Sequence, residues 1–461
     1  MNDPASASGS ASASDRAPAA VPFRAAFWFW LKLGFLSFGG PAGQISMMHQ
    51  ELVERRRWIS EGRFLHALNY CMVLPGPEAQ QLATYIGWLM HRTWGGIVAG
   101  GLFVLPSLFI LIGLSYVYMA YGSVPAVAGL LYGIKPAVVA IVLAAAWRIG
   151  QRALKHPALW AISVAAFVAI YAFALPFPLI VIGAGLIGAI GGRLAPQVFA
   201  TGAAHAASQK KYGAALIDDD TPTPEHATYR LSRVASYALA GLVLWAIAMG
   251  GLVAAFGWES TLARMGWFFT KAALLTFGGA YAVLPYVYQG AVDHYHWLTA
   301  TQMIDGLALG ETTPGPLIMV VAFVGFVGGW TGELFGPASL LLAGAAAATV
   351  VTYFTFLPSF VFILVGGPLV ETTHGDLKFT APLTGITAAV VGVIVSLALF
   401  FAGHVFWPGG AVGDSVVRFD WISALGALAA LVAAVRYKVG LIPLICFAAT
   451  AGMVLRLAGL A

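Results

Sequence analysis

The sequence predicts an all-α polytopic membrane protein built from two homologous halves. Of its 461 residues, 60% are apolar and only 9% are charged, whereas a soluble chain carries about 25% charged residues. Several apolar runs reach the roughly 20 residues that a spanning helix needs, and the alternating pattern of barrel strands is absent. Residues 28–77 also recur at 267–316 with a constant offset of 239, and 14 of the 50 aligned positions are identical. A repeat of this length indicates two structural units of the same kind.

The first repeat is expected to span residues 23–195. The preceding residues, 1–22, are rich in Ala and Ser and lack the apolar core of a signal peptide. We expect them to form a disordered tail.

Two broken helices open the first repeat. Gly39-Gly40-Pro41 interrupts one apolar segment and Pro75-Gly76-Pro77 interrupts the next. Glycine accepts non-helical backbone angles, and proline prevents a helix from continuing. A break inside a membrane is costly unless it lines a cavity or is buried in protein, and the helix N-terminus that follows it is a natural anion site. The breaks therefore predict an anion site, and packing kinks are the alternative interpretation.

Further elements follow in order along the chain. Four full spans are expected at about 94–118, 126–147, 158–174 and 177–194, and a polar cytoplasmic linker with little pattern for a core at 196–234. An unmatched apolar helix is expected at 235–258, and the second repeat at 263–461. Within that repeat, Leu357-Pro358-Ser359 matches Leu105-Pro106-Ser107 at offset 252. Because residues 267–316 match at offset 239, the second repeat carries 13 additional residues between these two matching segments (252 against 239).

Matching loops of the two repeats carry opposite charge biases. Residues 54–57 include three arginines, whereas the aligned residues 293–296 include none, and Arg436 and Lys438 lie in a loop whose counterpart at 175–178 is uncharged. The positive-inside rule then predicts opposite orientations, and the extra helix at 235–258 supplies the odd crossing that inversion requires. We expect an inverted repeat with broken or re-entrant helices, with the N-terminus cytoplasmic. A parallel duplication is the alternative.

The candidate substrate-binding residues lie at or beside the breaks. A lysine precedes each Phe-Gly-Gly break within an apolar segment, where an ionisable residue is a functional candidate; snorkelling to the interface is the alternative. A hydroxyl residue directly before each break either binds an oxyanion or bonds to a backbone carbonyl of its own helix. The full set is Lys32, Ser37, Gly39, Gly40, Pro75, Gly76, Pro77, Gln80, Lys271, Thr276, Gly278, Gly279, Thr313, Pro314, Gly315 and Pro316.

Two acidic residues near the Pro-Gly-Pro motifs, Glu78 and Glu311, are candidate proton carriers, with an interfacial carboxylate as the alternative for each. No metal-ligand cluster, nucleophile–base pair or nucleotide-binding loop is visible in the sequence. We therefore expect no metal, no cofactor and no enzymatic activity. The net charge of +5 arises in short loops between apolar runs, so nucleic acid is not an expected partner and the lipid bilayer is.

The residues of the two breaks resemble a known signature. Leu36-Ser37-Phe38-Gly39-Gly40-Pro41, the charged stretch that ends at Trp58, and Leu74-Pro75-Gly76-Pro77 are similar to the motifs of the chromate ion transporter (CHR) superfamily, in its long-chain two-domain type. The resemblance covers nearly all of 23–461, although Ala280 stands where the first repeat has Pro41. It implies a bacterial inner-membrane protein that exports chromate and confers resistance, with sulfate as a related substrate or competitor.

The charge of the substrate supports the outward direction that the resemblance implies. Moving one charge across the membrane is worth about 2.3 kcal/mol per 100 mV, so a dianion leaving a negative-inside cell gains about 4.6 kcal/mol. Membrane potential or proton antiport is the expected driving force. A sulfate or other oxyanion transporter and an anion channel are the alternatives, and the sequence leaves a homodimer open.

Overall fold

The computed structural model describes residues 18–199, 212–277, 279–372, 380–408 and 419–460. Within these ranges the regular structure is helical, apart from one isolated bridge between Ile59 and Ile217. Most of the predicted tail lies outside them.

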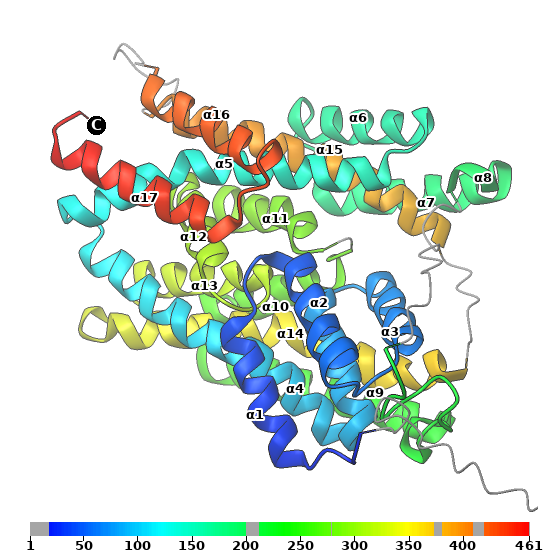
Figure 1. Ribbon diagram of the computed structural model, residues 1–461. Coiled ribbons are helices and arrows are strands. Elements are labelled where there is room, and N and C mark those ends of the chain that lie inside the picture. The colour runs from blue at the N-terminus through cyan, green and yellow to red at the C-terminus, as the bar shows by residue number, and fades with distance from the viewer. Residues whose placement is uncertain (1–17, 200–211, 278, 373–379, 409–418, 461) are drawn as a thin grey trace, which may run out of the picture.

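Figure 1 shows α5, α6, α15, α16 and α17 above α1, α4, α10 and α14. The helices are α1 (Phe23–Leu36), α2 (Gly40–His49), η2 (Gln50–Arg55), α3 (Glu61–Val73), α4 (Glu78–Tyr121), α5 (Pro125–Ala153), α6 (Pro157–Tyr171), α7 (Phe177–Leu194), α8 (Pro196–Phe199), η3 (Glu225–Ala227), α9 (Leu231–Phe256), α10 (Thr261–Leu274), α11 (Ala280–Tyr288), η4 (Gln289–His294), α12 (Ala300–Thr312), η5 (Leu317–Met319), α13 (Val320–Thr331), η6 (Pro337–Ser339), α14 (Leu340–Thr372), α15 (Thr380–Phe406), α16 (Trp421–Val435) and α17 (Leu441–Leu457).

The structure repeats where the sequence repeats. Each half begins with a helix, a glycine break and a second helix that ends in a π-helical turn, and the turns η2 and η4 are separated by the offset of 239. The amide of Trp58 donates to the carbonyl of Leu52 at 2.7 Å, and that of Trp297 donates to the carbonyl of Ala291 at 2.8 Å. The sequence offset therefore reproduces local backbone geometry, not only helix positions.

The second helical pair of each half is also broken in the same place. α3 and α12 end just before Pro-Gly-Pro, and α4 and η5–α13 begin just after it. α4 is interrupted by non-helical backbone at His91 and Arg92. It therefore consists of a short helix after the break and a long helix, which correspond to α13 and α14.

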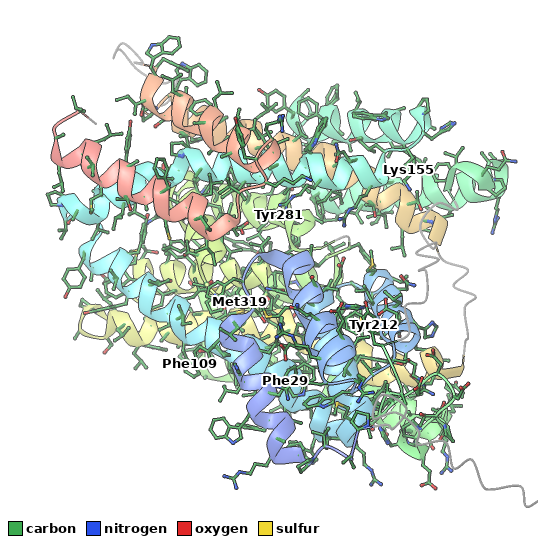
Figure 2. All side chains as sticks on the ribbon, viewed as in Figure 1. Phe29, Phe109, Lys155, Tyr212, Tyr281 and Met319 are labelled. Carbon is green, nitrogen blue, oxygen red and sulfur yellow. The ribbon has the colours of Figure 1, made fainter. Side chains whose placement is uncertain are left out.

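Six helices among the described residues are long and apolar enough to cross a membrane: Glu78–Tyr121, Pro125–Ala153, Phe177–Leu194, Leu231–Phe256, 337–371 and 381–406. Large apolar side chains such as Phe109, which is 68% exposed (Figure 2), face outward from them. The expected span at 158–174 is shorter in the structure. α6 ends at Tyr171 after 15 residues, which gives about 22 Å of helix against a hydrocarbon core of about 30 Å.

The long helices of the two halves interlock. α5 packs against α17 and α15 packs against α7, so each central helix contacts the last helix of the other half. Glycines allow these close approaches: a Cβ on Gly133 would lie 2.0 Å from the carbonyl oxygen of Ala448, and one on Gly385 would lie 2.4 Å from that of Ala184. At both contacts a glycine of the central helix lies against a backbone carbonyl of the last helix of the other half. The two halves therefore pack as one unit.

The linker is more structured than its polar sequence indicates. Ile217 pairs with Ile59, Ser60 Oγ donates to Asp219 at 2.6 Å, and Tyr212 (Figure 2) donates to Glu54 at 3.3 Å. Residues 212–230 therefore pack against the helices although their sequence has little pattern for a core. Isolated apolar residues among many polar ones produce no periodic pattern, yet Ile217 and Ala227 are buried in a core cluster that also contains Phe64 of α3.

The same linker segment contacts the end of α14. Glu371 accepts hydrogen bonds from Tyr85 and from Thr223, and pairs with Arg63 at 3.5 Å. His226 bonds to the carbonyl oxygen of Trp88 at 2.8 Å, and burial lowers the pKa of its imidazole. We refer to residues 212–230 as the linker cap.

Candidate functional site

The four breaks meet in reciprocal pairs. The amide of Gly76 donates to the carbonyl oxygen of Thr276 at 2.8 Å, and the amide of Gly315 donates to that of Ser37, also at 2.8 Å. Each Pro-Gly-Pro turn of one half therefore bonds to the Phe-Gly-Gly break of the other half. The site is made by both halves together, and neither contains it alone.

Glycine is required at these positions by backbone geometry. Gly76 has φ +130°, Gly315 has φ +107°, and Gly39 and Gly279 have φ +91° and +94°. Side-chain-bearing residues rarely adopt such angles. Helices α2, α4, α11 and η5 begin directly after the breaks, and the first N–H groups of a helix have no partner within it. Each joined pair of breaks thus brings two helix starts together, and an anion is favoured at such N-termini.

Buried polar side chains surround the two turns. A Cβ on Gly76 would lie 2.4 Å from Ser359 Oγ, and one on Gly315 would lie 2.7 Å from Ser107 Cβ. Ser107 and Ser359 are related by the offset of 252, and neither hydroxyl has a hydrogen-bond partner among the described residues. Both are free to donate to an oxyanion.

Three glutamines complete this polar lining. Gln44 donates to the carbonyl oxygens of Gly315 at 2.5 Å and of Ser37 at 3.2 Å, Gln80 donates to Thr84 at 3.0 Å, and Gln81 donates to Pro75 at 2.8 Å. The amide oxygen of each is buried and has no partner in the part of the chain that the structure describes. The sequence predicted Gln80, which closely follows Pro75-Gly76-Pro77, but not Gln44, whose contact with Gly315 spans 271 positions.

Both candidate proton carriers lie beside the second Phe-Gly-Gly break, Glu78 near Gly279 and Glu311 bonded to Tyr281 two residues further along the chain. A Cβ on Gly279 would be 4.0 Å from Glu78 Oε1, which places Glu78 of the first half beside a break of the second. Glu311 is 5% exposed and accepts a hydrogen bond from Tyr281. Figure 2 shows Tyr281 on α11.

The hydroxyl candidates bond within their own helices. Ser37 donates to Leu33 at 2.6 Å, Thr276 to Ala272 at 2.7 Å, and Thr313 to Gly310 at 2.9 Å. Their hydrogens are therefore engaged, and it is the carbonyl groups of Ser37 and Thr276 that join the breaks. Gly278 lies outside the described residues.

The two lysines lie on the helices before the breaks. Lys32 is exposed on α1, whose buried face is formed by residues such as Trp30 and Leu33, and Lys271 stands 5.7 Å from the Trp267 ring centroid. The exposure of Lys32 favours the alternative interpretation, snorkelling to the membrane interface, over a place at the joined breaks.

We expect Lys32→Ala to transport at close to the wild-type rate, because its exposed side chain is free to reach the membrane interface. Lys271→Ala is the matched variant in the other half and loses its contact with Trp267. Initial rates of anion flux at equal protein levels measure both. A Lys32→Ala protein that is made normally but inactive would restore Lys32 to the substrate site.

Among the described residues, no group of three His, Cys, Asp or Glu side chains has the proximity to hold a metal ion. The chemistry that the arrangement offers is anion binding by helix N-termini and by the hydroxyl groups of Ser107 and Ser359.

Comparison with known proteins agrees with this chemistry. The chromate transporter family model matches residues 24–189 and 263–453. A chromate transport protein of Pseudomonas aeruginosa is 33% identical over 440 residues, which cover 92% of this chain and 94% of that protein. A chromate transport protein of Cupriavidus metallidurans is 28% identical over 404 residues (87% and 88%), and a probable chromate transport protein of Synechococcus elongatus is 27% identical over 367 residues (79% and 81%). No solved structure matches significantly.

Proposed function

The chain belongs to the chromate transporter family, and from this premise we propose that it exports chromate through the site where the four breaks meet. The observation that carries the proposal is the reciprocal bonding of Gly76 to Thr276 and of Gly315 to Ser37. It joins broken helices of both halves around unpaired donors and helix N-termini. A tetrahedral dianion is well matched to donors that converge from several directions.

We propose that the halves are oppositely oriented in the bacterial inner membrane. We count the long part of α4, α5, α6 and α7 as four passes and α9 as the fifth before the second half begins. In this count α6, about 22 Å long, crosses a locally thinner bilayer. The linker cap and the N-terminus lie on the cytoplasmic side, where the arginines of 55–57 are also found. The reciprocal bonds and the corresponding helix contacts support a pseudo-twofold arrangement in which the two faces alternate.

Outward movement requires no coupled ion. A dianion gains about 4.6 kcal/mol for each 100 mV of negative-inside potential when it leaves the cell. Membrane potential therefore drives export, proton antiport adds to it, and removal of chromate from the cytoplasm confers resistance. Sulfate has the same shape and charge and competes at the site.

The test is chromate uptake by everted membrane vesicles under an imposed potential or pH gradient. We expect accumulation that rises with potential and falls when sulfate is added, while vesicles without the protein show neither. Absence of accumulation under every gradient overturns the proposal. Ionic currents too fast for an alternating carrier identify a channel instead.

A further inference from the structure

A cavity lies at the end of the molecule remote from the linker cap. It has a volume of about 520 Å³ and its lining includes Tyr118 of α4, Lys135 of α5, Thr301 and Asp305 of α12, and Arg456 of α17. Thr93, near the other end of α4, contacts Tyr237 just after the linker cap. The 25 residues between Thr93 and Tyr118 correspond to about 37 Å of helix, so the cavity and the cap lie on opposite faces.

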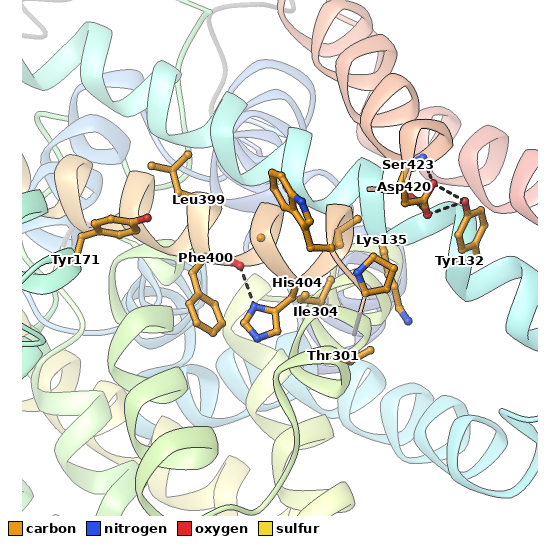
Figure 3. Close-up of a pocket in the computed structure, with 14 residues that line it drawn as sticks. Tyr132, Lys135, Tyr171, Thr301, Ile304, Leu399, Phe400, His404, Asp420 and Ser423 are labelled. Atoms are coloured by element: carbon orange, nitrogen blue, oxygen red, sulfur yellow. Dashed lines mark hydrogen bonds between the residues drawn. The ribbon is translucent and has the colours of Figure 1, made fainter. Parts of the chain in front are cut away.

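An adjoining cavity of about 630 Å³ shares Lys135 and Thr301 (Figure 3). Its acidic residue, Asp420, is already engaged: it caps α16 through Ser423 and accepts a hydrogen bond from Tyr132 at 2.8 Å. Asp420 is therefore not available to a ligand, and the charged side chains of the 520 Å³ cavity are.

Lys135 and Asp305 form an open ion pair. Lys135 Nζ lies 3.6 Å from Asp305 Oδ1, the lysine side chain is 26% exposed, and that of Asp305 is only 3% exposed. Tyr118 donates to Oδ2 at 2.9 Å, whereas Oδ1 has no hydrogen bond within the described ranges. A closed charge-assisted bond is about 2.8 Å long. The ammonium group is thus turned toward the cavity while its partner stays buried.

The pair occurs in one half only. The offsets of 239 and 252 place His66 and Val370 at the positions of Asp305 and Tyr118, and His66 bonds to the Val370 carbonyl at 3.0 Å. The position of Lys135 is Thr387 in the second half. The helix contact is thus repeated but the charges are not, so the fold does not require them.

We propose that this cavity is a second oxyanion site, in which a tetrahedral dianion replaces Asp305 as the partner of Lys135. The inference rests on the proposed function and extends it to a site at the face opposite the linker cap. A buried carboxylate that loses its cation is strongly disfavoured, so Asp305 takes a proton from cavity water as the anion binds. The remaining charges, Lys135 and Arg456, match those of a dianion.

Release reverses the exchange. When the anion leaves, Asp305 returns its proton to water and pairs again with Lys135, which makes the carboxylate a built-in competitor for the site. Asp305 and Glu311 are six residues apart on α12, about 9 Å along the helix, so this helix links the cavity to the joined breaks. The titratable and charged groups that face the pair from neighbouring helices are Tyr118, Tyr132, His404, Asp420 and Arg456.

Cysteine protection tests the site. Thr301→Cys is made together with Cys446→Ser, because Cys446 is exposed and Cys71 is buried. The rate at which the purified protein reacts with a methanethiosulfonate reagent is measured with and without sulfate, which does not oxidise thiols. We expect sulfate to slow labelling at position 301. In the wild-type protein, labelling of Cys446, which does not line either cavity, is the control and is unaffected.

Variants of the ion pair separate the possible outcomes. The quantity compared is the sulfate concentration that halves the labelling rate at position 301. Lys135→Met should raise it about tenfold or more, because a charge-assisted contact is lost. Lys135→Arg should leave protection intact, and Asp305→Asn should lower the concentration needed. Chromate transport by wild-type vesicles without sulfate protection at position 301 overturns this inference and leaves the proposed function standing. Protection without chromate flux supports the anion site and overturns transport.

Discussion

Alanine at Gly76 or Gly315 is expected to abolish chromate transport. Both residues have positive φ, at +130° and +107°, and positive φ costs a side-chain-bearing residue about 1–3 kcal/mol. The added Cβ would also lie 2.4 Å from Ser359 Oγ in one case and 2.7 Å from Ser107 Cβ in the other. Relief of these contacts moves the turn, and with it the amide that bonds to the opposite half. We expect flux to fall at least about a hundredfold, a barrier increase of about 2.7 kcal/mol.

Gly101 and Gly113 are the matched controls. Both lie on α4, and a Cβ on either meets nothing within 4 Å. Gly101→Ala and Gly113→Ala should transport normally, because alanine favours a helix more than glycine does. Flux in everted vesicles, normalised to protein in the membrane, measures all four. Equal flux in Gly315→Ala and Gly113→Ala contradicts a functional turn.

Glutamine at Glu311 is expected to remove the response of transport to a pH gradient and to lower flux about tenfold, the size of a typical single charge-assisted contact. Glutamine still accepts the hydrogen bond from Tyr281, so the local packing is preserved while the capacity to bind a proton is lost. Chromate flux at fixed membrane potential, with and without a pH gradient, measures the effect.

Glu78→Gln is the counterpart at the other Pro-Gly-Pro motif. Tyr281→Phe keeps the carboxylate and removes only the hydroxyl, so its effect on flux should be smaller than that of Glu311→Gln. If Glu311→Gln responds to the pH gradient as the wild type does, Glu311 is not a proton carrier and export depends on potential alone.

Local sequence patterns predicted the breaks with accuracy. Gly-Gly and Pro-Gly-Pro determine backbone angles through the residues themselves, and the structure ends α1, α3, α10 and α12 at these motifs. The extra helix, expected at 235–258, is α9 at Leu231–Phe256. Long apolar runs therefore predict where a helix begins and ends to within a few residues.

Side-chain neighbours could not be predicted in this way. Gln44 reaches Gly315, 271 positions away, and Asp305 meets Lys135 across the halves. Neither residue has a counterpart of its own type in the repeat, so the repeat contains no signal for it. Lys32 does have a counterpart, Lys271, yet its side chain is exposed. The repeat shows which residue type recurs at a position, but not which residues it contacts in the fold.

The sequence by itself determined the membrane class, the two homologous halves and the places where helices break, because these depend on composition and on short-range backbone sterics. Only the tertiary structure decided that each break bonds to one in the other half, that polar residues of the linker cap pack against α3, and that Lys135 and Asp305 share a cavity. These contacts join residues far apart in the chain, and the packing of all the helices together determines them.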